Sequence, residues 1–297
     1  MLKKSALRRI IISSFALILF LIIQMIPSNI YPNNISVVYE QKKDIPVYLI
    51  DPKNYTSRIT ISYFDNNIKD IVNILTINND NRVLIPIGFN AVIPENTKLL
   101  DYHIKDNILY LNFSSELLNV TKENEEKLIE CLVYSLCELK GINGISLLVN
   151  NQKLTKLPNS GYELPNVLNY EYGINKSYYL SNLKDSSQVT VYYMSKYNDI
   201  SYYVPITKIT NNNVSKIETI VSELKTTPFV NNNISSYLKA SYELEQYEIL
   251  ENSIKLTFNN EILTGLTDKN IEEELKYMLT LSIRDTYNIE DVTININ

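Results

Sequence analysis

The 297-residue sequence is poor in the residues from which most active sites are built: it has one histidine, two cysteines, six glycines and no tryptophan. Six glycines are too few for a glycine-rich nucleotide-binding protein. The one histidine, His103, lies on a predicted strand, with no partners for a catalytic triad and no ligand set for a metal. We therefore predict that the protein is not an enzyme and has no catalytic, cofactor-binding or metal-binding residues.

Both cysteines, Cys131 and Cys137, fall in one predicted helix. Six residues turn a helix by about 600°, so the two thiols point to different faces and cannot bridge each other within that helix. We expect two buried, free thiols.

The charge of the chain is distributed unevenly. The net charge is -5, and residues 1–30 carry four basic residues and no acid, so the remainder carries -5 minus 4, or -9. An acidic body is a poor ligand for nucleic acid, because binding requires basic surface that replaces counterions. We expect no nucleic-acid partner.

Ile10 to Ile26 is an uncharged apolar run of 17 residues behind a basic cluster. This length is at the short end of the range that crosses a bilayer, and the basic flank favours a cytoplasmic N-terminus. We predict a basic start and transmembrane signal anchor over residues 1–30, a stalk over 31–43, and a body outside the cytoplasm. A cleaved signal peptide is the alternative.

Residues 44–157 predict two strands, a short helix with its apolar stripe from Ile68 to Leu75, and a hairpin over 99–113 turning at Asp106-Asn107. A longer helix follows Thr121, the expected N-cap. Glutamates near its start suit the helix dipole, and we expect them to be unsequestered. Gly141 is the expected C-cap, and Ile145 to Val149 the closing strand.

The main discovery in the sequence is an internal repeat. Asp106–Leu118 aligns with Glu251–Leu263 at an offset of 145, and the following helix and strand align at an offset of 147. Ser135, on the apolar helix stripe, meets Ser282. Each copy is therefore predicted as β-β-α-β-β-α-β, with the second over residues 188–297. We predict an α+β protein with two tandem sandwich-like domains, each a small sheet covered by two helices.

Residues 158–187 between the copies predict a partly packed linker rich in tyrosine. Its tyrosines either pack against the two domains, which we favour, or form a surface for sugars or proteins. Tyrosine pairs at 192–193 and 202–203 lie on predicted strands, and aromatic faces of this kind can stack on sugars.

The first copy combines a Pro-x-x-Thr-x-Leu entry, a strand that ends in a Leu-Asn-Phe-Ser segment, a Val-Tyr-x-Leu-x-Glu helix and an apolar closing strand. With these motifs it resembles the GerM-domain family. The matching scaffold positions are Pro94, Thr97, Leu99, Leu111, Phe113, Ser114, Tyr134, Leu136 and Ile145. Their repeat counterparts and neighbours in the more divergent second copy, which lacks the proline entry, are Leu256, Phe258, Leu279, Ser282, Ile283 and Val292.

The resemblance implies a fold similar to the ring-building domains of secretion systems and a non-enzymatic role. It implies a membrane-anchored scaffold in the sporulation envelope between mother cell and forespore, needed for germination competence, with envelope proteins and possibly itself as partners in a ring-like assembly. The alternative, based on the tyrosine-rich strands, is an extracytoplasmic module that binds peptidoglycan or another glycan.

Overall fold

The computed structural model describes residues 14, 15, 18, 43–63, 67–78, 83–180, 186–211, 214–226, 234–264, 270–289 and 291–297. Lys42–Asn297 forms one compact unit. The predicted anchor at 10–26 and stalk at 31–43 lie outside the described residues, except for helical positions 14, 15 and 18 and for Lys43. No helix within the described ranges is long and apolar enough to cross a bilayer.

Both copies of the predicted repeat have the expected order of elements. The first consists of β1 (Lys43–Ile50), β2 (Thr56–Tyr63), α2 (Ile68–Leu75), β3 (Leu99–Lys105), β4 (Ile108–Phe113), α3 (Glu125–Leu136) and β5 (Gly144–Val149). The second consists of β8 (Ser187–Tyr197), β9 (Ile200–Thr210), α4 (Lys216–Lys225), β11 (Leu244–Ile249), β12 (Ser253–Phe258), α5 (Glu273–Tyr287) and β15 (Asp291–Ile296). Short strands β6 (Gln152–Lys153), β7 (Ser177–Tyr179), β10 (Ile234–Ser235), β13 (Leu263–Thr264) and β14 (Asn270–Ile271) complete the set.

Local sequence explains where these elements begin and turn. Asp106 and Asn107 both adopt positive φ, 51° and 60°, as a two-residue hairpin turn requires. Ser215 and Glu218 form a capping box at the start of α4, which satisfies two backbone donors of the first turn. The apolar stripe of α2 is buried, as its spacing predicts.

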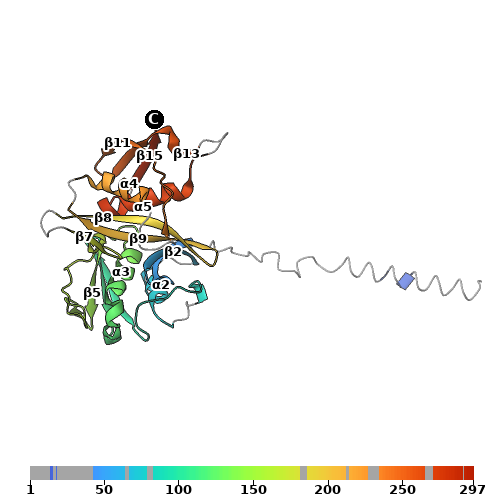
Figure 1. The fold of residues 1–297 in the computed structure, drawn as a ribbon. Coiled ribbons are helices and arrows are strands. Elements are labelled where there is room, and N and C mark those ends of the chain that lie inside the picture. The colour runs from blue at the N-terminus through green and yellow to red at the C-terminus, as the bar shows by residue number, and fades with distance from the viewer. Residues whose placement is uncertain are drawn as a thin grey trace, which may run out of the picture. The chain divides into compact units, whose positions relative to one another are not determined.

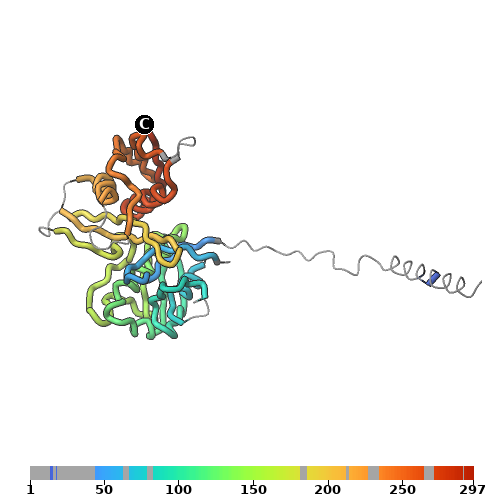
Figure 2. The backbone as a smooth tube through the Cα atoms, turned by 45° about the vertical axis from the view of Figure 1, so that its right-hand side comes forward, coloured from blue at the N-terminus to red at the C-terminus, as the bar shows by residue number. Residues whose placement is uncertain are grey.

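The strands form three main sheets, and one of them is shared by the two repeats. Its order is β1-β2-β9-β8-β10, with β7 also paired to β9, and Arg58 on β2 lies opposite Tyr203 on β9. The other two are β3-β4-β5-β6 and β11-β12-β15. In Figures 1 and 2 the green part of the first repeat and the orange-to-red part of the second lie on either side of the yellow strands β8 and β9.

The α+β prediction is confirmed, but the expectation of one small sheet per domain is incomplete. The first two strands of each copy pair with each other, and the two hairpins join into one sheet where β2 of the first copy pairs with β9 of the second. Residues 158–187 are also more than a linker, since β7 adds a strand to the shared sheet. The predicted boundaries at 44–157 and 188–297 describe sequence repeats within the compact unit and stay predictions as domain limits.

Three details at α3 differ from prediction. Thr121 occupies the cap position of a short 3-10 turn, Lys122–Asn124, and its side chain makes no capping hydrogen bond. The helix ends at Leu136 with Cys137 as C-cap, so Gly141 lies in the following turn, where it has φ +84°. Glu125 is buried and accepts hydrogen bonds from the backbone N–H groups of Asn159 and Ser160.

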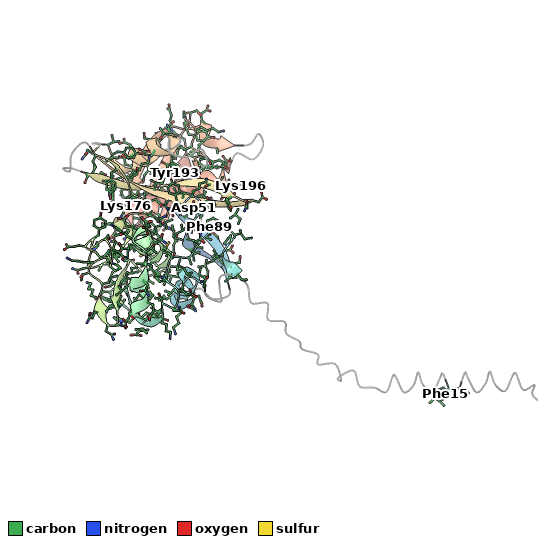
Figure 3. The ribbon with its side chains drawn as sticks, turned by 60° about the horizontal axis from the view of Figure 1, so that its bottom comes forward. Phe15, Asp51, Phe89, Lys176, Tyr193 and Lys196 are labelled. Atoms are coloured by element: carbon green, nitrogen blue, oxygen red, sulfur yellow. The ribbon has the colours of Figure 1, made fainter. Side chains whose placement is uncertain are left out.

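The strand tyrosines are core residues. Tyr192, Tyr193 and Tyr202 are 1% exposed or less, and Tyr203 is half-buried. Both faces of the shared sheet are covered here, so alternation along the strand exposes none of them fully; Figure 3 labels Tyr193 among the packed side chains. Cys131 and Cys137 are both buried and free, as predicted.

Candidate functional site: the polar junction between the repeats

Most of the predicted scaffold positions lie in the hydrophobic core of their own repeat. Leu111, Phe113, Tyr134, Leu136 and Ile145 are fully buried, as are Leu256, Phe258, Leu279, Ser282 and Ile283. Pro94 is buried, whereas Thr97, Leu99, Ser114 and Val292 are partly exposed. The Ser114 hydroxyl accepts a hydrogen bond from the Lys98 N–H at 3.0 Å. These positions shape the fold, and only Tyr134 and Ser282 take part in the junction described next.

The repeated serine connects the long helix of each copy to the first strand. The Ser135 hydroxyl on α3 accepts a hydrogen bond from the Tyr48 N–H of β1 at 2.9 Å. The Ser282 hydroxyl on α5 accepts one from the Tyr192 N–H of β8, also at 2.9 Å. A small residue lets helix and strand approach closely, and its oxygen satisfies a buried donor that would otherwise lack a partner.

These hydrogen bonds hold the two tyrosines so that their side chains meet at the junction. The hydroxyl oxygens of Tyr48 and Tyr192 lie 2.7 Å apart, and both rings are completely buried. The Tyr192 hydroxyl donates to Asp285 on α5, while the Tyr48 hydroxyl lies 3.2 Å from Glu138, just beyond α3. Since Tyr192 gives its one proton to Asp285, its oxygen can only accept here, so the single proton of Tyr48 is shared between the Tyr192 oxygen at 2.7 Å and Glu138 Oε1 at 3.2 Å.

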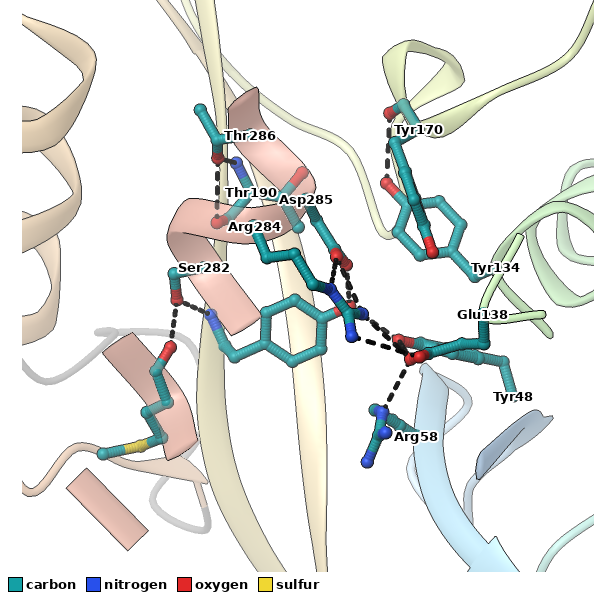
Figure 4. A network of polar contacts seen from close by, with 12 residues as sticks. Tyr48, Arg58, Tyr134, Glu138, Tyr170, Thr190, Ser282, Arg284, Asp285 and Thr286 are labelled. Atoms are coloured by element: carbon teal, nitrogen blue, oxygen red, sulfur yellow. Dashed lines mark hydrogen bonds and ion pairs between the residues drawn. The ribbon is translucent and has the colours of Figure 1, made fainter. Parts of the chain in front are cut away.

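Two arginines neutralise the acids (Figure 4). Arg284 donates from both terminal nitrogens to Glu138, at 3.1 and 3.0 Å, and from Nε to Asp285 at 2.9 Å. Arg58 donates from Nε to Glu138 at 2.9 Å. Glu138 of the first repeat is thus held by one arginine from each repeat, and its side chain is 7% exposed. Forked guanidinium-carboxylate pairs fix geometry as well as charge.

The pKa values of Glu138 and Asp285 are shifted in opposite directions. Burial raises the pKa of Glu138, but Arg58 and Arg284 outweigh it, and the pKa lies below its usual range. Burial dominates at Asp285, which has one arginine and a neutral tyrosine as partners, and its pKa is raised. Burial also raises the pKa of the Tyr48 and Tyr192 hydroxyls, so both stay protonated at neutral pH.

The segment between the repeats closes the other side of the network. Tyr170 packs edge-on against Tyr134, with ring centroids 5.0 Å apart, and its carbonyl accepts from the Tyr134 hydroxyl at 3.2 Å. On the second repeat, Thr286 Oγ1 accepts from the Thr190 N–H at 2.9 Å. The prediction that the linker tyrosines pack holds for Tyr170.

The sequence contained a signal for this site that the prediction did not use. Glu138 and Asp285 stand at the same offset of 147 as the paired serines, and Tyr48 and Tyr192 stand at an offset of 144. Corresponding acids and corresponding tyrosines therefore meet where the copies join. Arg58 and Arg284 have no basic counterpart at the matching offsets, so the repeat pattern does not indicate them.

The junction is suited to rigid coupling rather than to chemistry. Its acids are paired and its tyrosine hydroxyls are neutral, so no group in it is an activated nucleophile or base. Glu138 and Arg284 also line a groove of about 520 Å³ between the helix ends and the hairpin turns at Asn107 and Asn252. No cluster of three metal-ligating side chains occurs among the described residues.

Comparison with known proteins agrees with the repeat structure. Residues 46–155 match the model of the family described as "Germane: Sporulation and spore germination". This stretch is a GerM-family domain. The chain is 26% identical over 258 residues to the spore germination protein GerM of Bacillus subtilis, a match that covers 84% of this chain and 70% of that protein.

The fold of both repeats also has a solved counterpart. The structure of the tandem GerMN domains of the sporulation protein GerM from Bacillus subtilis superposes with a TM-score of 0.75. The match has 24% sequence identity and covers 86% of this chain and 91% of that one. At this identity the likeness establishes the fold of two GerM-type domains in tandem.

Proposed function

We propose that this protein is a non-enzymatic assembly protein of the sporulation envelope. In this proposal residues 10–26 anchor it in the membrane, and the compact unit stands outside the cytoplasm, between mother cell and forespore, where it contributes to germination competence. The similarity to GerM over 258 residues is the observation that carries the sporulation role.

The junction supports the assembly part of the proposal. A protein that presents two repeats to other proteins benefits from a fixed angle between them, because repeats joined flexibly lose entropy when partners bind. We call residues 44–157 and 188–297 the two lobes. Here a shared sheet and a buried ionic network couple the lobes. Buried ionic groups have a documented role in fixing register between elements.

Gene deletion tests the sporulation role. We expect deletion to lower the yield of heat-resistant spores, and a fluorescent fusion to collect at the septum between the two cells. Complementation with Glu138→Ala should fail to restore yield if the angle between lobes matters, whereas Glu163→Ala, at an exposed surface pair, should restore it. Normal spore yield together with absence from the septum would reject the proposal.

A glycan-binding role is the second candidate, and the structure changes its basis. The tyrosines of β8 and β9 that suggested it are largely buried, but Tyr162, Tyr178 and Tyr179 in the segment between the repeats are more than half exposed. Sedimentation with purified cell wall tests this role. Retention that disappears in a Tyr178→Ala, Tyr179→Ala variant would favour it, and no retention of the folded protein would exclude it.

A further inference from the structure

The closing strands of the two repeats, β5 and β15, pair in the same way with the hairpin strand at their inner edge. They differ at the outer edge, the one that faces away from that hairpin. β5 and β15 each run parallel to the preceding hairpin strand in the same register, and the N–H groups of Asn150 and Asn297 bond to Phe113 and Phe258. The outer edge of β5 is covered by its own chain. Leu154 N–H donates to the Leu147 carbonyl at 2.9 Å, and β6 continues this pairing.

A second segment covers the start of β5. Leu168 exchanges two hydrogen bonds with Ile145, at 2.7 and 2.9 Å, and the Leu168 side chain is buried. By contrast, no described residue pairs with the outer edge of β15, which ends its sheet in the order β11-β12-β15. Figure 1 labels this strand in the red, C-terminal part of the chain.

The register fixes which backbone groups of β15 are unpaired. Along a strand, successive residues direct their N–H and C=O groups to opposite sides. Asn297 bonds to β12, and Ile145, the counterpart of Val292, bonds outward. The N–H and C=O groups of Val292, Ile294 and Ile296 therefore face outward from the sheet.

The side chains of Val292, Ile294 and Ile296 are also more exposed than their counterparts in the first repeat. Ile145, Leu147 and Val149 of β5 are 0%, 2% and 9% exposed, whereas their counterparts Val292, Ile294 and Ile296 are all only partly buried. The second repeat thus has an apolar stripe and a row of backbone groups at the place where the first repeat binds a strand. Both features suit an added strand.

The other long edges carry features that discourage strand addition. Pro46 removes a backbone donor from β1, Asp101 and Lys105 place charges on β3, and Glu245 and Glu248 place charges on β11. Such residues are the usual protection of exposed edges. β15 has one charge, on Asp291 at its first position.

We propose that the outer edge of β15 binds an extended, basic segment of a partner protein by antiparallel strand addition. The segment that pairs with β5 indicates the chemistry, because it places the basic Lys153 opposite Leu148 and is followed by the apolar Leu154, whose N–H bonds to Leu147. Residues 188–297 carry 9 basic and 15 acidic side chains, a net charge of -6, which attracts such a segment and repels a second copy of the repeat.

This inference rests on the proposed assembly role for its biological use, but its experiment measures binding in vitro and can fail while a sporulation role stands. The probe is a labelled peptide with the sequence of residues 150–157, NNQKLTKL, titrated onto the full chain in detergent by fluorescence anisotropy. We expect saturable binding, weakened by salt and lost when both lysines are replaced by glutamate. We also expect slower amide exchange at Ile294 and Ile296.

Two variants at one position make the test specific. Val292→Pro removes an outward N–H, the counterpart of the one that Ile145 donates, and leaves the ladder to β12 intact; Val292→Ala keeps that N–H. We expect Val292→Pro to weaken the peptide about tenfold more than Val292→Ala, the effect of one lost hydrogen bond. Thermal unfolding checks that both variants fold.

Three results would overturn the proposal. One is the absence of binding to the folded protein. Another is binding that Val292→Pro leaves unchanged, which would place the peptide at the β5 edge or elsewhere. The third is protection of β15 amides that rises with protein concentration without peptide, together with dimers in sedimentation, which would make a second copy the occupant.

Discussion

Glu138 is the residue whose removal should most damage the junction between the repeats. Replacing it with alanine leaves Arg58 and Arg284 without their shared acid and leaves the Tyr48 hydroxyl without its nearest carboxylate. The Arg58 side chain is 6% exposed, so water cannot replace the lost partner. Breaking a buried ion pair by removing one member costs about 3–5 kcal/mol.

For a protein of this size each kcal/mol lowers the melting temperature by about 2–4 °C, so we expect a fall of about 6–20 °C. Urea unfolding followed by circular dichroism measures the free energy directly. The matched control is Glu163→Ala, which breaks a pair with Lys156 at 3.4 Å in which the side chains are 82% and 60% exposed. Exposed pairs of this kind contribute about 0–1 kcal/mol.

The pH dependence gives an independent check. The pKa of Glu138 is lower in the folded state than in the unfolded state. Its contribution is therefore present above the unfolded pKa and is lost as pH falls through the folded pKa. The difference in stability between wild type and Glu138→Ala should shrink on acidification below about pH 4.5. Equal stability losses in Glu138→Ala and Glu163→Ala at pH 7 would refute the reasoning.

Three further predictions concern other buried polar groups. Burial raises the pKa of Glu130 to about 7, so this carboxyl increasingly opposes folding as the pH rises from about 4.5 to 7. The stability of Glu130→Gln relative to wild type should therefore increase by about 3 kcal/mol across that window. Urea titrations at pH 5 and pH 8 measure the difference. Ser135→Ala and Ser282→Ala should each lower the free energy of unfolding by about 1–3 kcal/mol, because each leaves a buried backbone N–H without an acceptor. A large difference between the two losses would contradict the structural equivalence of the repeats. Cys131 and Cys137 should react with a thiol reagent only after denaturation, since burial raises both pKa values, that of Cys137 to about 12; rapid labelling of the native protein would count against the packing of α3.

Much of the fold follows from local patterns in the sequence. The hairpin turn at Asp106-Asn107 is encoded by residues that tolerate positive φ, and the apolar spacing of α2 appears directly as its buried stripe. The offsets of 145 and 147 predict corresponding strands and helices in both copies, including the serine on each long helix. These features depend on residues close in sequence or on comparison of one copy with the other.

The ends of α3 show why some local predictions were wrong. Thr121 is a good cap by residue type, but a 3-10 turn separates it from the helix. Glu125 appeared to be a solvated acid and is buried, because backbone N–H groups 34 and 35 residues downstream bind its carboxylate. Distant partners of this kind leave no local trace in the sequence.

The sequence by itself determined the repeated β-β-α-β-β-α-β order, the buried thiols and the resemblance to the GerM family. Only the tertiary structure decided how the repeats join. The pairing of β2 with β9 and the contact of Glu138 with Arg284 both depend on packing between segments that lie more than 100 residues apart in the sequence. Periodicity reports which face of an element is apolar, but it does not report which other element covers that face. The same limit applies to β15, where the sequence repeats the strand and the structure shows that its outer edge has no partner among the described residues.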